Sequence, residues 1–439
     1  MKRLLIRRIA VLVALAVLAT SAVPADAQSP RRGAAEGPRL ILIRDAETES
    51  LLRTYANPLF RAAGVDPNLV RIVLIRDNAI NSFVSTGNIL FVHTGLVMKA
   101  TSALELVGVL AHETGHIAGG HLAKLPDALR EAMIESIVAM LVGVAAGVAS
   151  RDGSGIGAGI GGQQISQRTF LAFTRGMERS ADQAGVSFLE ANNWSSQGLL
   201  DLFHHLEAQE ALTPGLQDPY LRTHPLTRER IAFIEQQVAA SPHSKTPLPD
   251  GFESGFLMVR AKLNGFLNPS SDTLRTVRAD DPSPAARYAR AIALYRLGHL
   301  AEALPLLDTL IAERKTSPWL HELKGQILFE NGRVRESIGP YREAIRLAPD
   351  QPLLRISLAQ AMVETGDPLL LRPAIRELQP ALEHEHDNTT GWRTLATAWG
   401  KVGDIGQANL ALAEEALANG NIPLARGLAT RAERRSLSP

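Results

Sequence analysis

Two histidines and a glutamate stand in the pattern His-Glu-x-x-His, as His112, Glu113 and His116, inside a strongly apolar stretch. Residues four apart lie one above the other on a helix, so the two imidazoles can bind one metal ion together. Glu113 lies one position further round and borders the open side of that ion, where it can act as a base toward water. The pattern predicts a zinc peptidase.

A catalytic zinc site needs a third protein ligand, with the fourth position left to water. Since the chain has no cysteine, that ligand must be a histidine or a carboxylate. We expect it to be Glu178, on a helix that carries Asp182 one turn later on the same face. Asp182 would accept the free ring N–H of His112 or His116 and fix its tautomer. The alternative is that Glu178 and Asp182 form the solvated side of an amphipathic helix.

His224, in the segment Thr223-His224-Pro225, is the candidate for a further catalytic group. Pro225 keeps the preceding residue extended, which suits presentation of a side chain from a loop. In the expected reaction Glu113 takes a proton from a water polarised by the metal and passes it to the leaving amine. His224 would then donate to the oxyanion of the tetrahedral intermediate, or fill the open zinc position in a resting enzyme. A surface histidine in a turn is the third interpretation.

The other histidines are not expected to bind metal. His121 lies five positions after His116 and is therefore expected to point away from the ligand face. His204 and His205 lie on a later helix without metal spacing. If residues 88–92 form an edge strand beside the metal helix, substrate backbone could pair with that strand by strand addition.

The elements that position these residues are a small sheet and several helices. Helical spacing predicts a first helix over residues 46–63 and the metal helix over 102–122, with Ser102 as its N-cap. Runs rich in valine and isoleucine at 69–75 and 89–93 predict strands, and the polar residues between them predict turns. Further helices are expected over 128–149, 169–192 and 196–211.

One of these helices is strongly apolar and precedes a glycine-rich run. Residues 137–149 carry no charge, but these thirteen residues are fewer than the roughly 20 that span a bilayer. We expect a buried or membrane-touching helix over 128–149. Residues 153–162 contain six glycines and predict either a mobile lid or a plain connector.

The C-terminal part is repetitive. Glycine recurs at Gly298, Gly332 and Gly366, an interval of 34 residues that is the period of tetratricopeptide helix pairs. Gly403 and Gly420 indicate degenerate pairs that cap the stack. The expected fold is therefore mainly α, with an α+β zincin-like metalloprotease domain followed by an α-helical repeat solenoid. We expect a signal peptide at 1–27 and a metallopeptidase domain at 38–242. A linker with the first helices follows at 243–284, and the repeats occupy 285–437.

The first residues are typical of an export signal, with a basic start, an apolar core over 9–23 and a small-residue cleavage site at 25–27. We expect cleavage there and a periplasmic mature chain. The formal net charge is +1 for the whole chain. It falls to about −2 without residues 1–27, at the usual side-chain pKa values. A nearly neutral chain gives no electrostatic case for binding nucleic acid.

Together these features resemble the BepA-type periplasmic metalloproteases of Gram-negative bacteria, within the group of zinc peptidases that includes the HtpX heat-shock and CaaX prenyl proteases. The resemblance rests on the export signal, residues 106–116, 178–182 and 223–225, and the repeats. It implies one zinc ion per chain. The implied zinc ligands are His112, His116 and Glu178, and the implied general base is Glu113. His224 is implied as a regulatory or transition-state histidine, and Asp182 and Arg230 as supporting residues.

The resemblance also implies a cellular role. Such proteins degrade misassembled outer-membrane proteins, and their repeats engage the assembly machinery. We therefore expect a periplasmic zinc endopeptidase with protein substrates and at most peripheral membrane contact. The rival is a chaperone or scaffold that acts through its repeats, with the metal site silenced by His224. A third interpretation is an integral-membrane protease anchored by residues 128–149.

Overall fold

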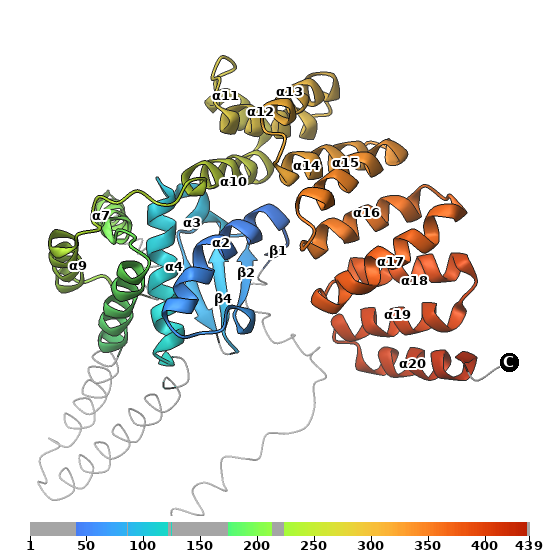
Figure 1. Ribbon diagram of the computed structural model, residues 1–439, viewed down its shortest axis with the longest axis horizontal. Coiled ribbons are helices and arrows are strands. Elements are labelled where there is room, and N and C mark those ends of the chain that lie inside the picture. Colours follow the sequence, from blue (N-terminus) through green and yellow to red (C-terminus); the bar gives the residue numbers. More distant parts are fainter. Residues whose placement is uncertain (1–40, 86, 122–123, 125–173, 213–223, 437–439) are drawn as a thin grey trace, which may run out of the picture. The chain divides into compact units, whose positions relative to one another are not determined.

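The computed structural model describes residues 41–85, 87–121, 124, 174–212 and 224–436 (Figure 1). The predicted export signal, the apolar helix at 128–149 and the glycine-rich run at 153–162 lie outside these residues. No helix in the described ranges is both long enough and apolar enough to cross a membrane.

The sheet has four strands in the order β1-β2-β4-β3. They are β1 (Leu42–Ile43), β2 (Arg71–Ile75), β3 (Ser82–Ser85) and β4 (Ile89–His93). β2 and β4 run parallel, whereas β1 and β3 are antiparallel to their neighbours. The strands predicted at 69–75 and 89–93 are therefore present as β2 and β4.

One prediction about this sheet was wrong. Residues 82–85 were expected in turns because of their serines, but they form β3, in which the Ser82 hydroxyl is satisfied by donating to the carbonyl of Phe91. The condition set for strand addition at residues 88–92 is not met, because β4 lies between β2 and β3. Among the described strands, the edge next to the metal helix is β3, which contacts α4 (Ala103–Ala118).

Helices pack around this sheet. The N-terminal helices after β1 are α2 (Ala46–Ala62), α3 (Thr94–Lys99), α4, a helix at 174–191, α7 (Gln197–Leu212), α9 (Arg228–Ala240) and α10 (Phe252–Leu267). Helix α4 is central, since it contacts α2, α7, α10 and β3 (Figure 1). Most of its residues are buried. The shared core includes Leu52, Leu106, Leu110 and Phe256. A metal ligand on α4 is therefore held by a rigid element.

The start of α4 follows the predicted cap. The Ser102 hydroxyl accepts the backbone N–H of Glu105 at 3.3 Å, as an N-cap does. The Glu105 carboxylate accepts the backbone N–H of Thr101 at 2.9 Å, one residue before the position that a strict capping box uses. The helix ends at Ala118, earlier than the predicted residue 122, because Gly119 and Gly120 turn the chain.

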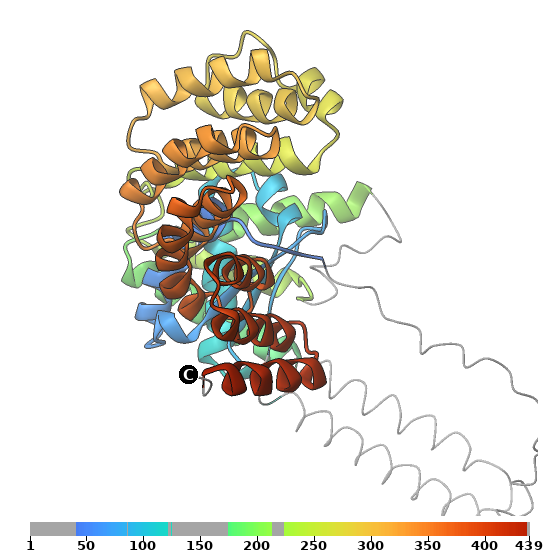
Figure 2. The same cartoon turned by 90° about the vertical axis from the view of Figure 1, so that its right-hand side faces the viewer.

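The C-terminal part is a stack of helix pairs (Figures 1 and 2). Its helices are α11 (Ser270–Thr276), α12 (Pro284–Arg296), α13 (Leu300–Glu313), α14 (Pro318–Glu330), α15 (Val334–Leu347), α16 (Pro352–Glu364), α17 (Pro368–His384), α18 (Thr389–Val402), α19 (Ile405–Ala418) and α20 (Ile422–Ser436). Gly298, Gly332 and Gly366 all have φ between 70° and 82°, which ends the first helix of each pair. The 34-residue glycine period therefore marks the turn inside each pair, as predicted.

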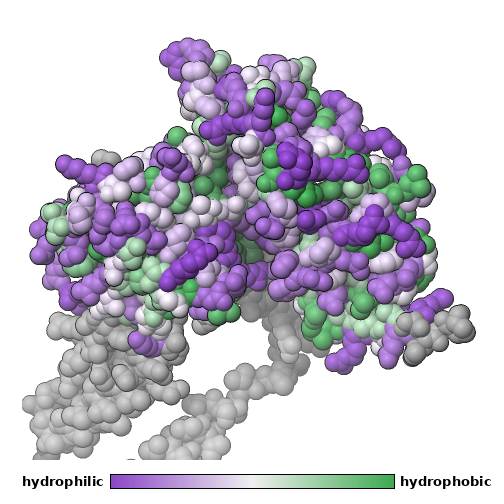
Figure 3. All heavy atoms as spheres, in the orientation of Figure 1, coloured by the Kyte–Doolittle hydropathy of each residue, from purple (hydrophilic) through white to green (hydrophobic). Residues whose placement is uncertain are grey.

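Hydrophobic side chains are exposed on the last helices of the stack (Figure 3). The large ones with the greatest exposure there are Leu369, Ile405, Leu410, Leu417, Ile422 and Leu424. Five of these six side chains lie on α19 and α20, so the last two helices are candidates for contact with another protein.

A buried charge cluster joins the N-terminal part to the repeats. The ammonium of Lys262 on α10 lies 2.6 Å from Asp45, 3.3 Å from Glu47 and 3.5 Å from Glu322 on α14. One cation thus faces three carboxylates. Burial, together with repulsion from Asp45 and Glu47, raises the pKa of Glu322 to about 7 despite the attraction of Lys262.

Candidate metal centre

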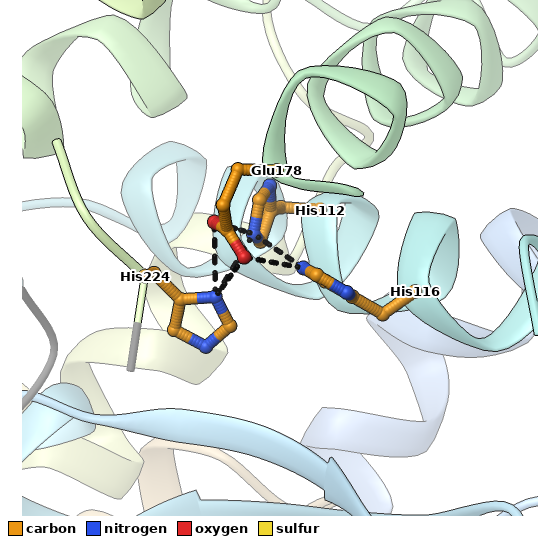
Figure 4. Close-up of side chains that lie close together, drawn as sticks. All are labelled: His112, His116, Glu178 and His224. Carbon is orange, nitrogen blue, oxygen red and sulfur yellow. Dashed lines mark hydrogen bonds and ion pairs between the residues drawn. The ribbon is translucent and has the colours of Figure 1, made fainter. Parts of the chain in front are cut away.

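Four side chains from three separate segments meet at one point (Figure 4). His112, His116, Glu178 and His224 each offer one ligand atom, and these atoms all lie within 4.8 Å of one another. The Nε2 atoms of His112 and His116 are 3.1 Å apart, and they lie 3.4 Å and 3.3 Å from the carboxylate oxygens of Glu178. The residues that the sequence singled out as metal-binding are therefore brought together.

The helix that carries Glu178 approaches α4 closely because of a glycine between the metal histidines. A Cβ on Gly115 would lie 2.5 Å from the carbonyl oxygen of Ala181. Only glycine leaves room for that backbone, so the fourth position of the His-Glu-x-x-His pattern allows the two helices to approach closely. Glu178 is 2% exposed and Asp182 is fully buried, so the solvated-face interpretation of this pair is wrong.

Asp182 and Arg230 support His112 from behind. The Nδ1–H of His112 donates to Asp182 Oδ1 at 2.8 Å, and Arg230 donates to both oxygens of Asp182. Arg230 Nη1 also lies 3.0 Å from Glu178 Oε2. Although burial alone would raise it, these partners hold the pKa of Asp182 below its ordinary value. The carboxylate therefore stays ionised and fixes the tautomer of His112.

His224 reaches the cluster from the loop before α9. Its Nδ1 lies 3.2 Å from both oxygens of Glu178 and 3.3 Å from His112 Nε2, while its Nε2 is 3.1 Å from the carbonyl oxygen of Ser82 on β3. We assign the proton to Nε2, which donates to Ser82, because the carbonyl can only accept. The lone pair of Nδ1 then faces the cluster. The side chain is 5% exposed, so the surface-histidine interpretation is wrong.

The atoms that face the centre fit a cation. When the Nδ1–H groups of His112 and His116 are turned outward, their Nε2 atoms, His224 Nδ1 and the Glu178 oxygens are all acceptors. Burial opposes protonation of His112, but Asp182 and Glu178 outweigh it and raise its pKa to about 9, so the site attracts positive charge. Two imidazoles and a carboxylate form the donor set of a catalytic zinc site.

Glu113 lies beside the cluster as a buried carboxylate. It is fully buried, and neither of its oxygens has a hydrogen-bond partner among the described residues. The Nε2 atom of His224 lies 3.5 Å from Glu113 Oε1. Because burying an unsatisfied carboxylate is costly, such a group is typical of a functional site rather than of a structural core.

His121 was predicted to point away from the ligands, and that prediction was wrong. Its Nδ1 lies 3.0 Å from the Nδ1 of His116, and the side chain is 6% exposed. The prediction extended the helix beyond Ala118, whereas the chain turns at Gly119 and Gly120. These two glycines were the sequence feature that indicated the end of the helix before His121.

The chain is similar to a known peptidase family and to tetratricopeptide repeats. Residues 44–238 match the model of peptidase family M48, and residues 271–318 and 288–352 match a tetratricopeptide repeat. The chain is 25% identical over 400 residues to the beta-barrel assembly-enhancing protease of Yersinia pestis, covering 88% of this chain and 80% of that protein. The Escherichia coli (strain K12) protein of that name is 23% identical over 378 residues, which cover 83% of this chain and 75% of that protein. The solved structure of YrrB, a TPR protein, aligns with 40% of this chain and 91% of the YrrB chain, at 12% identity and a TM-score of 0.32.

Proposed function

We propose that this chain is a zinc endopeptidase, because residues 44–238 match the model of peptidase family M48, contain a buried histidine and glutamate cluster, and precede segments that match a tetratricopeptide repeat. The observation that carries the proposal is the convergence of His112, His116 and Glu178 beside the unsatisfied carboxylate of Glu113. Two imidazoles and a carboxylate favour zinc over harder cations, at one ion per chain.

Each residue of the centre would have a separate role in the reaction. A bound zinc ion would polarise the peptide carbonyl and make water more acidic. Glu113 would take the proton of the attacking water and pass it to the leaving amine. Asp182 and Arg230 would hold His112 in the tautomer that presents Nε2 to the ion.

His224 would occupy the fourth ligand position in the resting enzyme. Its position 3.2 Å from Glu178 and its bond to the Ser82 carbonyl support this role. Substrate backbone that pairs with β3 would compete for that same carbonyl, since β3 is the sheet edge beside α4. Entry of substrate would thus release His224 and free the fourth ligand position.

The proposed substrates are misfolded outer-membrane proteins, and the proposed location is the periplasm. The relatives in Yersinia pestis and Escherichia coli are named as beta-barrel assembly-enhancing proteases, which supports this role. The repeats would engage the assembly machinery, and their exposed apolar helices support contact with a protein partner. The rival role is a chaperone or scaffold in which the metal site is silent.

Replacing Glu113 by Gln separates the two roles. The enzyme role predicts that zinc stays bound while casein hydrolysis falls by about 10²- to 10⁴-fold, because the general base is lost. Glu207→Gln, at an exposed position of α7, is the matched control and should behave like the wild type. In cells that lack the wild-type gene, unchanged outer-membrane assembly with Glu113→Gln would instead support the scaffold role.

A further inference from the structure

We propose that His121 is a positioning residue that holds the ring of His116 in the tautomer required for metal binding; this rests on the proposed zinc site. The two Nδ1 atoms lie 3.0 Å apart. The rings meet edge to face, with centroids 4.9 Å apart and an interplanar angle of 83°. This geometry suits one N–H donating to the lone pair of the other ring.

The direction of that hydrogen bond follows from the position of His116. Its Nε2 faces Glu178 and the Nε2 of His112, so Nε2 is the atom that would bind the ion. A neutral imidazole that binds metal through Nε2 carries its proton on Nδ1. The Nδ1–H of His116 therefore donates to Nδ1 of His121, which keeps its own proton on Nε2. The two helical ligands are thus oriented differently, His112 by the carboxylate of Asp182 and His116 by an uncharged imidazole.

The backbone after α4 is built to return His121 to the ligand. The helix ends at Ala118, and Gly120 has φ of +58°, in the left-handed region that favours glycine. A Cβ on Gly119 would overlap the imidazole of His121, so glycine at this position leaves room for that ring where it now lies. On a continuous helix a residue five positions after His116 would face elsewhere. The Gly-Gly turn is what brings the imidazole of His121 against His116.

The test measures zinc affinity in the purified full chain, by competition with a chromogenic chelator. His121→Ala removes the acceptor and is expected to weaken zinc binding about 10- to 100-fold, the usual effect of removing the partner of a metal-bound histidine. His121→Asn offers a side-chain oxygen near the position of Nδ1 and should recover most of the lost affinity. His204→Ala is the matched control, because that side chain is half exposed on α7 and pairs only weakly with Glu235, at 3.6 Å.

A purely structural role for His121 predicts a different pattern. In that case Ala and Asn would lower the unfolding temperature of the metal-free protein alike, and zinc affinity would stay within about twofold of the wild type. That result would overturn the proposal while leaving the metal site itself intact. If the wild-type protein bound no zinc, the proposed function would fall as well, so the wild-type titration distinguishes the two failures.

Discussion

Arg230 donates to both carboxylate oxygens of Asp182, from Nε at 2.6 Å and Nη2 at 2.9 Å, and Asp182 in turn accepts the Nδ1–H of His112. Arg230 is 4% exposed and Asp182 is fully buried, so each charge depends on the other. The contact connects α9 to a metal ligand on α4. It makes the orientation of His112 depend on a residue 118 positions later in the chain.

Replacing Arg230 by Lys tests this connection. Lysine keeps the positive charge but lacks the planar fork that binds both oxygens at once. We expect zinc affinity to fall by about tenfold or more, because the partner of His112 is no longer fixed. Arg228→Lys, at an exposed position two residues earlier, is the control. Chelator competition gives both dissociation constants, and equal values for the two variants would refute the role of the bidentate contact.

His224→Ala tests whether this histidine closes the centre at rest. If His224 occupies the fourth position in most molecules, activity is limited by the open fraction. We therefore expect casein hydrolysis by the variant to rise several-fold, with a weaker affinity for zinc because one ligand is lost. The comparison is made at saturating zinc, with His204→Ala as the control. A lower kcat with unchanged zinc affinity would instead assign His224 to the transition state.

Glu322 makes the stability of the chain depend on pH. Its pKa is raised from 4.5 to about 7, so folding favours the protonated form. The stabilisation is complete below about pH 4.5 and is lost as the pH rises through 7. Between these values the free energy of unfolding should fall by at most about 3 to 4 kcal/mol, at about 1.4 kcal/mol per pKa unit.

Glu322→Gln should reduce this pH dependence, because glutamine resembles the protonated acid, while Glu47 in the same cluster still has a raised pKa because of burial. Denaturant midpoints at pH 5 and pH 8 measure the effect. The variant is expected to exceed the wild type in stability at pH 8, whereas Glu364→Gln, at the exposed end of α16, should not. An equal loss of stability in wild type and Glu322→Gln between the two pH values would assign it to other groups.

Much of the site could be predicted because its chemistry depends on local spacing. His112 and His116 are one helical turn apart, and Glu178 and Asp182 repeat that spacing on a second helix. The repeats could be predicted from the 34-residue period, since each helix pair needs the same glycine turn.

The rest depends on tertiary structure. β3 was missed because serine favours turns in isolation, and only pairing with β4 satisfies the Ser82 hydroxyl. The contact of His121 with His116 was missed because the periodicity was continued through Gly119 and Gly120. Arg230 was assigned only through the family resemblance, since no spacing relates it to Asp182.

The central claim is that one divalent ion is held jointly by His112, His116 and Glu178. Elemental analysis of the purified wild-type protein and of Glu178→Gln, each dialysed against a weak chelator, tests it most directly. We predict about one equivalent of zinc in the wild type, little or none in the variant, and casein hydrolysis only in the wild type. Full zinc content and undiminished hydrolysis in Glu178→Gln would contradict the account.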